Sequence, residues 1–223
     1  MIDSALSLPE YYNRRAPEYE RMWYRDDPVR QQEQSAIIAA MSAVLQKKRV
    51  LELACGTAYW TQFVVPVAES IVALDASEEM LALAREKKLD AGRVQFVRGD
   101  AYALESLPGS FNAAMANFWF SHVPKARQEE FLDGLHKKLA PGASVFMADN
   151  VYVPGVGGEL LDRPGSDDTY KLRTLADGST HEVLKNYFSS GELEEIFARR
   201  GCELKIHIGQ CFWWLSYTAL ECV

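Results

Sequence analysis

The sequence has no excess of basic residues, and this lack bears on its ligands. Its 223 residues include 24 lysines and arginines against 31 aspartates and glutamates, a formal net charge of −7. Nucleic-acid-binding domains usually carry a basic surface, because contacts to phosphates supply much of their affinity. The composition therefore indicates that neither DNA nor RNA is a partner.

Long apolar runs are also missing. No apolar stretch approaches the roughly 20 residues that cross a bilayer, and the N-terminal "MIDSALSLPE" lacks the basic start and apolar run of a secretory signal. Hydrophobic residues make up 48% of the chain and charged residues 25%, as in soluble globular proteins. We expect a cytoplasmic protein with no membrane partner.

Cysteine is scarce, which argues against two other classes of protein, those built on zinc fingers and those held by disulfide bonds. The four cysteines show no CxxC pair and no metal-finger spacing; they are Cys55, Cys202, Cys211 and Cys222. Buried free thiols are predicted in preference to a disulfide framework.

What the sequence does contain is an alternation of strand and helix patterns, typical of a parallel sheet covered by helices. The strands predicted for this sheet are residues 49–54, 70–75, 94–100, 111–120 and 143–150. Helices are expected between them, among them one over 57–65 and one that starts at Pro124 and stops at Pro141. The sequence therefore predicts an α/β fold.

A different pattern follows the fifth strand. Glycine and proline crowd residues 151–168, which predicts a loop, and "TYKLRTL" and "THEVLK" flank the turn residues 176–179 as in a β-hairpin. Ser189 and Glu192 have the spacing of a capping box, which predicts a helix. Two closing strands are expected after it, at about 203–208 and 212–220.

Polar residues stand where the predicted parallel strands end, which is the usual ligand crevice of such folds. Asp75 ends the second strand, and a carboxylate there can accept hydrogen bonds from the two hydroxyls of a ribose. Asp100 ends the third strand and could accept from an adenine amino group. An adenosine-containing ligand is therefore indicated.

The loop after the first strand, "LELACGTAYW", is poor in glycine. A nicotinamide cofactor would place its pyrophosphate on a G-x-G-x-x-G turn, but here those positions are Ala54, Gly56 and Tyr59. Glu52 adds a carboxylate that would repel phosphates and suits an ammonium group instead. Nearby aromatic rings could face a positive sulfonium. We also expect Ala58 to avoid a positive φ, because its side chain disfavours that conformation.

Four stretches in this order, "VLELACGTAYW", "VALDASEEML", "VQFVRGDA" and "NFWFSHVP", resemble the successive motifs of the class I S-adenosylmethionine-dependent methyltransferases of small-molecule type. The resemblance covers about residues 11–220 and implies a single-domain Rossmann-like methyltransferase fold. That fold has a mostly parallel seven-stranded sheet with an antiparallel last strand and helices on both faces. The implied parts are an N-terminal helical lid (1–27), a cofactor-binding core (28–150), a loop and late β-hairpin insertion (151–188), and a C-terminal helix with closing strands (189–223).

The resemblance also implies the cofactor, S-adenosyl-L-methionine, its product S-adenosyl-L-homocysteine, and the residues that bind them. The expected cofactor-binding residues are Tyr12, Glu52, Ala54, Gly56, Thr57, Trp60, Asp75, Ala76, Met80, Asp100, Ala101, Asn117 and Phe118. Arg15 is expected near the cofactor's carboxylate.

The expected reaction is methyl transfer to a small-molecule acceptor, with O- or N-methylation foremost. His122 is the candidate catalytic residue, as a general base or an acceptor contact, since its ordinary pKa suits proton transfer near neutral pH. The candidate acceptor-binding residues are Tyr19, Trp23, Trp119, Tyr170 and Arg173.

Three alternatives remain open from the sequence. His122 could be a structural histidine at a helix start, and the protein could be a non-catalytic adenosine-binding module or, less in keeping with its loop, an NAD-dependent oxidoreductase. No metal is expected, because the pair Asp149–Asn150 lacks a second acid at the end of the fourth strand. A monomer or a homodimer would both fit.

Overall fold

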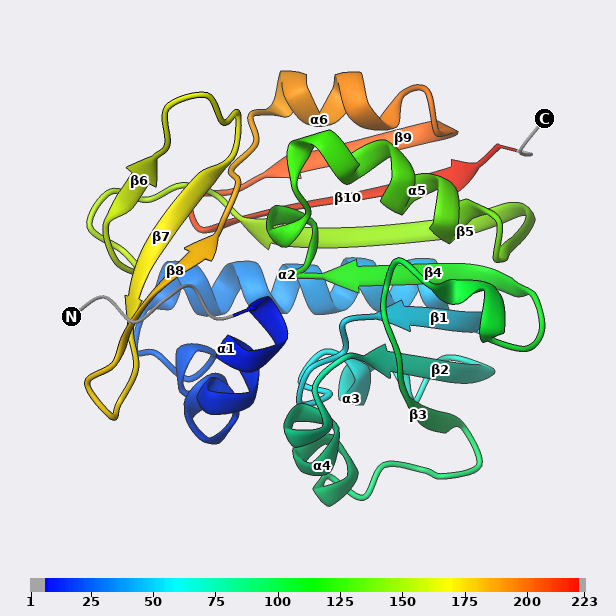
Figure 1. Ribbon diagram of the computed structural model, residues 1–223. Coiled ribbons are helices and arrows are strands. Elements are labelled where there is room, and N and C mark those ends of the chain that lie inside the picture. The colour runs from blue at the N-terminus through cyan, green and yellow to red at the C-terminus, as the bar shows by residue number, and fades with distance from the viewer. Residues whose placement is uncertain (1–6, 221–223) are drawn as a thin grey trace.

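A seven-stranded sheet forms the centre of the molecule (Figure 1), and the computed structural model describes residues 7–220. The strand order is β3-β2-β1-β4-β5-β10-β9. The strands are β1 (Arg49–Leu53), β2 (Ser70–Asp75), β3 (Val94–Arg98), β4 (Phe111–Asn117), β5 (Leu139–Asn150), β9 (Gly201–Ile208) and β10 (Phe212–Ala219). Strands β1 to β5 pair in parallel, whereas β10 runs antiparallel to both β5 and β9. The predicted α/β fold and its antiparallel last strand are confirmed.

Helices cover both faces of this sheet, as predicted. They are α2 (Pro28–Leu45), α3 (Thr61–Val64), α4 (Glu78–Glu86), α5 (Gln128–His136) and α6 (Ser190–Phe197). Helix α2 starts at Pro28 behind an Asp27 cap, and α6 has the capping box that Ser189 and Glu192 predict. No helix in residues 7–220 is long and apolar enough to cross a membrane.

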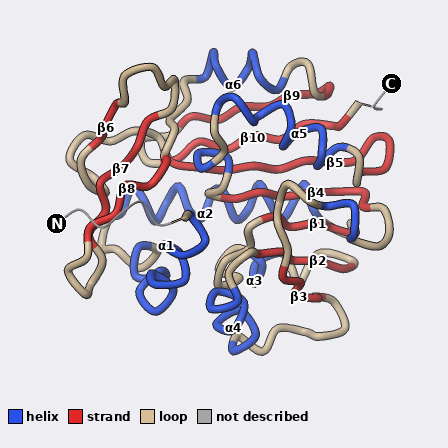
Figure 2. The backbone as a smooth tube through the Cα atoms, viewed as in Figure 1, coloured by secondary structure: helices blue, strands red, loops and turns tan. Residues whose placement is uncertain are grey.

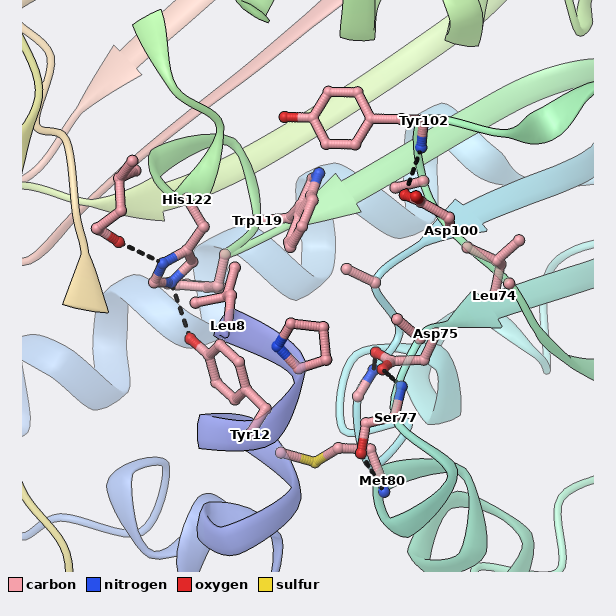
Figure 3. Close-up of a pocket in the computed structure, with 18 of the residues that line it drawn as sticks. Leu8, Tyr12, Leu74, Asp75, Ser77, Met80, Asp100, Tyr102, Trp119 and His122 are labelled. Atoms are coloured by element: carbon pink, nitrogen blue, oxygen red, sulfur yellow. Dashed lines mark hydrogen bonds between the residues drawn. The ribbon is translucent and has the colours of Figure 1, made fainter. Parts of the chain in front are cut away.

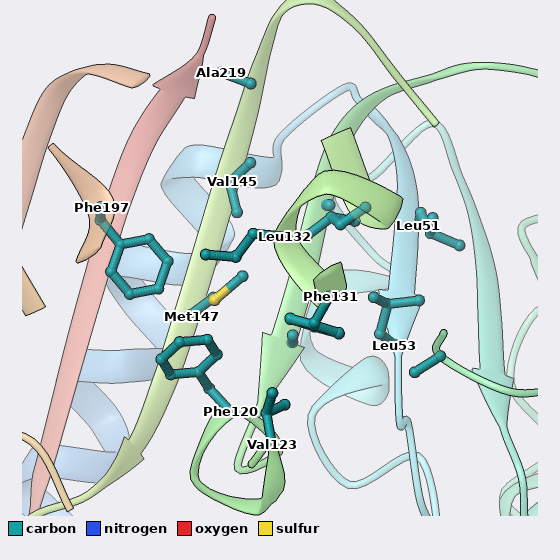
Figure 4. Packing of buried hydrophobic residues seen from close by; sticks show 14 of the residues in the cluster. Leu51, Leu53, Phe120, Val123, Phe131, Leu132, Val145, Met147, Phe197 and Ala219 are labelled. Atoms are coloured by element: carbon teal, nitrogen blue, oxygen red, sulfur yellow. The ribbon is translucent and has the colours of Figure 1, made fainter. Parts of the chain in front are cut away.

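Alternating strand residues divide the core into two layers, because successive side chains point to opposite faces. On one face, α5 and α6 bury Phe131 and Phe197 against Met147 of β5 (Figure 4). On the other face, α2 buries Ile37 and Met41. All five side chains are fully buried, so the sheet is held firmly from both sides.

A helical segment precedes α2 and consists of α1 (Leu8–Arg15) and the 3-10 helix η1 (Ala16–Met22). Its helical character agrees with the predicted lid, and part of that lid, residues 1–6, lies outside the described residues. Glu20 ties η1 to the core: its carboxylate accepts from Thr57 Oγ1 at 2.6 Å and pairs with Lys87 Nζ at 2.7 Å.

The insertion after β5 forms a second sheet of three antiparallel strands, β6 (Leu160–Asp162), β7 (Thr169–Thr174) and β8 (Thr180–Leu184). Figure 2 shows it beside α1, at the end of the main sheet where β5 leads into long loops. The predicted hairpin is therefore correct, and β6 adds a strand within the region predicted to be loop.

Two predicted helix boundaries are wrong for identifiable reasons, and the prediction for the cysteines holds only in part. The α5 helix stops at His136, because Leu139 already pairs with Phe111 of β4, so Pro141 lies within a strand. The predicted helix over 57–65 is α-helical only at Thr61–Val64, since the ligand loop takes up the preceding residues. The prediction of buried cysteines holds for Cys55 alone: Cys211 is half-buried and Cys202 exposed, while Cys222 lies outside the described residues.

The backbone of the loop between β1 and α3 has an unexpected conformation. Ala54, Gly56 and Ala58 have φ values of +54°, +56° and +61°. The prediction that Ala58 avoids a positive φ is therefore wrong. A left-handed backbone costs an L-residue about 1 kcal/mol, so two alanines here represent strain that the surrounding contacts must offset.

We predict that Ala54→Gly does not lower the stability as an ordinary alanine-to-glycine substitution in a helix does. Glycine removes the left-handed strain, which offsets the greater entropy of its unfolded chain. The free energy of unfolding should stay equal to wild type or rise by up to about 1 kcal/mol. The matched control Ala39→Gly, in the exposed middle of α2, should lower it by about 1 kcal/mol. Urea denaturation measures both, and equal losses would show that Ala54 is unstrained.

Candidate functional site

A cavity of about 450 Å³ lies at the carboxyl ends of the parallel strands, between the lid, α4 and the insertion (Figure 3). This volume is in the range of small-molecule sites. The predicted site residues among its lining are Tyr12, Tyr19, Ala54, Gly56, Asp75, Ala76, Met80, Asp100, Ala101, Phe118, Trp119 and His122. The structure thus brings together residues from all four motifs.

Asp75 is anchored by the ligand loop. Its carboxylate accepts from Gly56 N at 2.7 Å and from Ser77 N at 2.9 Å, one bond on each oxygen. Burial raises the pKa of this carboxyl group, and hydrogen bonds from the backbone oppose that rise. A carboxylate has about four acceptor positions, so each oxygen keeps capacity for one further hydroxyl. The geometry fits a ribose diol.

The wall of the cavity next to Asp75 is mostly apolar and contains a few polar atoms. Met80, Ala101 and Leu74 line it, which suits a flat heterocycle. Two lining side chains, Tyr102 and Trp119, bury a hydroxyl and an indole N–H that have no hydrogen-bond partner within residues 7–220. Buried polar groups are normally paired, so these two atoms are exceptions in the wall of the cavity.

Glu52 does not line the cavity. Its side chain is buried beneath the loop, where it accepts from Thr61 Oγ1 at 2.7 Å. Burial raises its pKa to about 8, against the opposing effect of the Thr61 bond, and the nearby Asp75 adds to the rise. In this arrangement Glu52 connects β1 to the start of α3, and its direct contact with a cofactor ammonium remains a prediction.

His122 stands at the opposite end of the cavity from α4 and makes a hydrogen bond through each ring nitrogen. Nδ1 lies 2.7 Å from the Leu184 carbonyl oxygen, and Nε2 lies 2.8 Å from the Tyr12 hydroxyl. A carbonyl only accepts, so Nδ1 carries the proton and Nε2 accepts from Tyr12. Burial, assisted by the charge of Lys185, lowers the pKa of His122 to about 3. The ring is therefore neutral.

Several predicted residues lie away from the cavity lining. Thr57 bonds to Glu20, Asn117 points its amide at Met41, and Trp23 and Trp60 pack in a buried aromatic cluster with Phe118. In the insertion, Tyr170 lies under the Arg163 guanidinium. Arg173 is half-buried on β7 and contributes no lining atom. Their binding roles stay predictions.

Sequence reasoning missed part of the cavity wall. The additional lining residues are Leu8, Pro9, Leu74, Ser77, Gly99, Tyr102, Pro124, Arg127 and Leu184. Tyr102 directly follows the predicted pair Asp100–Ala101, so a search extended by one residue would find it. Arg127, whose guanidinium lies 3.8 Å from the centre of the Tyr102 ring, had no sequence signal.

The pair Asp149–Asn150, considered for a metal, is engaged otherwise. Asp149 forms a buried ion pair with Lys185 Nζ at 2.7 Å and accepts from Ser121 N at 3.0 Å. Within residues 7–220 no group of three acidic, histidine or cysteine side chains is placed to hold a metal ion.

Comparison with known proteins finds a matching domain profile and similar solved structures. The sequence profile of a methyltransferase domain matches residues 50–142. The structure of a DhpI–SAH complex superposes with a TM-score of 0.78 and 27% identity, covering 96% of this chain and 95% of that one. The DhpI–SAM–HEP complex gives 0.76 and 28% over 95% and 99%.

Two curated relatives have related names. A ubiquinone biosynthesis O-methyltransferase of Pseudomonas aeruginosa is 28% identical over 75% of this chain and 69% of its own length. A demethylmenaquinone methyltransferase of Staphylococcus epidermidis is 31% identical over 46% of this chain, and the match spans only 43% of that protein.

The strand order, the Asp75 cavity and these matches agree: the structure has the fold of the class I S-adenosylmethionine-dependent methyltransferases, and residues 50–142 match a methyltransferase domain. The two DhpI structures are complexes with S-adenosylhomocysteine and with S-adenosylmethionine, respectively.

We predict that Glu52→Gln stabilises the protein increasingly as pH rises. The folded pKa of about 8 exceeds the ordinary 4.5, so the wild type loses stability as pH rises from about 4.5 to 8. Glutamine keeps an acceptor for Thr61 without burying a charge. The variant should match wild type near pH 4.5 and exceed it by roughly 3 to 5 kcal/mol at pH 8. Denaturation at several pH values, with the exposed Glu69→Gln as control, measures this gain; a constant difference would contradict it.

The substitution His122→Gln tests a buried group whose pKa is lowered, whereas that of Glu52 is raised. The folded pKa of about 3 lies below the ordinary 6.5, so between these values the unfolded chain binds a proton that the folded protein does not. Wild-type stability should therefore fall as pH drops below about 6.5, and the variant should lack this loss. Urea denaturation at pH 7 and pH 5 distinguishes them. The exposed His207→Gln should behave as wild type, and an identical response of His122→Gln would refute the burial argument.

Proposed function

We propose that the protein methylates an oxygen atom of a small-molecule acceptor. The observation that carries this proposal is one continuous cavity, with the ribose-type carboxylate Asp75 at one end and the polar pair Tyr12–His122 at the other. Cofactor and acceptor can therefore meet in one enclosed space. The name of the Pseudomonas relative, an O-methyltransferase, supports oxygen as the methylated atom.

Bound S-adenosylmethionine would supply a methyl carbon activated by positive sulfur. The residues that fit its adenosine part are Asp75 for the ribose and Met80, Asp100 and Ala101 around the base. Phe118 and Trp119 would border the methionine part, where aromatic rings can face a positive centre. The tasks left to the chain are to orient the acceptor in line with the methyl group and to exclude water.

The lid performs the second task. Tyr12 and Tyr19 from the N-terminal segment close the cavity above the strand ends, and Glu20 fastens that segment to Thr57 of the cofactor loop. Because the same loop donates Gly56 N to Asp75, lid closure and the shape of the ribose site are mechanically linked.

His122 serves in this proposal as a hydrogen-bond acceptor that positions Tyr12 or the acceptor. Its neutral ring cannot hold a proton without the cost of charging a buried group next to Lys185. Its Nε2 orients the Tyr12 hydroxyl or the acceptor. The Leu184 carbonyl accepts from Nδ1 and thereby fixes the tautomer of the ring.

The proposal predicts micromolar binding of S-adenosylmethionine and S-adenosylhomocysteine and none of NADH. Asp75→Asn should weaken binding of both adenosyl ligands at least about tenfold, since hydrogen bonds to a charged group contribute about 1.5–3 kcal/mol. The exposed turn variant Asp90→Asn should bind as wild type. Calorimetric titration measures all three proteins.

Either of two results would overturn this proposal. One is a folded wild-type protein that binds no adenosyl ligand, which would leave a non-catalytic module. The other is tight binding of NADH, which would favour an oxidoreductase. Transfer of a labelled methyl group to nitrogen acceptors alone would replace oxygen with nitrogen in the proposed reaction.

A further inference from the structure

The insertion sheet buries positive charge where apolar side chains are usual. In its register Lys171 lies opposite Val183 and Arg173 opposite His181, so these four share one face. Lys171 is 1% exposed, His181 3% and Val183 4%, which shows that this face packs inward. Lys185 follows β8 and is equally buried, at 3%. Lysine and arginine are rarely buried unless a partner compensates their charge.

One carboxylate compensates this charge incompletely. Asp149 pairs with Lys185. Lys171 donates to the Gly158 carbonyl at 2.9 Å and lies over the rings of Tyr152 and Tyr187, without a carboxylate. Among the described residues Arg173 makes no ion pair. The inward-facing charges therefore sum to an excess of two positive charges on the insertion side.

The lid adds another positive charge to the same region. Arg15 of α1 lies between three tyrosine rings, 5.2 Å from the Tyr19 ring centre and 5.8 and 5.9 Å from those of Tyr11 and Tyr12. It has no carboxylate partner in the part of the chain that the structure describes. The methionine end of the cofactor is a zwitterion, so its carboxylate can engage Arg15, but it brings an ammonium as well and leaves the excess positive charge in place.

These charged groups lie behind the acceptor end of the cavity and contribute no lining atom to it. Tyr12, His122 and Leu184 line that end. Lys185 directly follows Leu184 and donates to Ser121 Oγ at 2.6 Å, next to His122. The charges of Lys185 and Arg173 both lower the pKa of His122, and Arg173 also lowers that of Lys171, so their fields overlap here.

A buried polar atom marks the same face. His181 Nε2 lies 2.7 Å from Ser179 Oγ, whereas its Nδ1 is buried with no hydrogen-bond partner within residues 7–220. His181 packs edge-on against Tyr11 of the lid, at 5.8 Å between ring centres. His181 does not line the cavity, so an anion bound there would offset the excess charge of this face without contacting that nitrogen.

We propose that the methyl acceptor is a small oxyanion, a carboxylate or a phosphate-type group, drawn to the His122 end of the cavity by the excess positive charge of Arg173 and its neighbours behind the cavity lining. This inference rests on the proposed methyltransferase function and narrows its substrate class. Burying unbalanced cations destabilises a protein unless a ligand offsets them. Binding of an anion in a closed site near these cations gains charge neutralisation, which is stronger at low dielectric than in water.

The chemistry agrees with a neutral His122. An ionised oxygen already carries the electron pair that forms the new O–CH₃ bond, so no proton has to be removed. As that bond forms, the C–S bond breaks and its electron pair stays on sulfur, which becomes a neutral thioether. The acceptor loses one negative charge and leaves as a methyl ester. A general base is unnecessary, which agrees with a histidine whose pKa burial lowers to about 3 and whose Nε2 accepts from Tyr12.

The test uses the full chain saturated with S-adenosylhomocysteine and three probes of similar shape: benzoate, phenyl phosphate and neutral benzamide. At least one of the two anions should bind in calorimetric titration, with an affinity that falls as salt increases, and benzamide should not. Preference for benzoate indicates a carboxylate acceptor, and preference for phenyl phosphate a phosphate-type one.

Arg173→Gln removes one of the buried positive charges and should weaken binding of the preferred anion about tenfold, while the affinity for S-adenosylhomocysteine stays unchanged. The matched control is Arg163→Gln, an exposed arginine just after β6 that pairs with Glu182 on the other face of the insertion sheet. It should bind both ligands as wild type.

Three outcomes would overturn the proposal: no anion binding by protein that binds S-adenosylhomocysteine, equal binding of benzamide, or an Arg173→Gln variant with unchanged anion affinity. Failure to bind S-adenosylhomocysteine in the first place would contradict the proposed function itself, so the two failures are distinguishable.

Discussion

The imidazole of His122 connects three segments that are far apart in the sequence. Its Nε2 accepts from Tyr12 of the N-terminal lid, its Nδ1 donates to Leu184 of the insertion, and its backbone belongs to the turn after β4. The cavity exists because these segments meet there. A charged imidazole would reverse the hydrogen bond, so that the Tyr12 hydroxyl accepts, and would be repelled by Lys185; the neutral state that burial imposes avoids that repulsion.

The opposite end of the cavity depends on a loop with little glycine. Ala54 and Ala58 take a left-handed backbone that glycine would adopt without strain. Two buried carboxyl groups support the loop: Asp75 accepts from the backbone of Gly56, and Glu52 reaches Thr61 at its far side. These bonds explain how a glycine-poor loop keeps the geometry that a ribose site needs. They also give Glu52 a role beneath the loop that the strand-end pattern alone could not distinguish from direct ligand contact.

The sequence predicted the strand ends well, because the order of a parallel sheet fixes which residues share an edge. Asp75, Met80, Asp100 and Phe118 all line the cavity. The prediction was weaker where a side chain can turn inward or outward from the same backbone position. Trp23 and Trp60 looked available to a ligand but stack into the core, and Arg127 reaches the cavity from a helix start that had no visible motif. Rotamers and tertiary packing decide such cases, and a local pattern does not contain them.

The charged residues of the insertion show the same limit of prediction from a local sequence pattern. Lys171, Arg173 and Lys185 occupy alternate positions of a hairpin that the sequence predicted, so their common face was already implied by the period of a strand. Solvent normally covers such a face, and only its contact with the lid and with Asp149 reveals that it is buried. The whole chain carries a net charge of −7, yet this interior region is positive. A field of one sign enclosed by low-dielectric walls attracts ligands of the opposite sign, so the local arrangement of charge, and not the total, selects the acceptor.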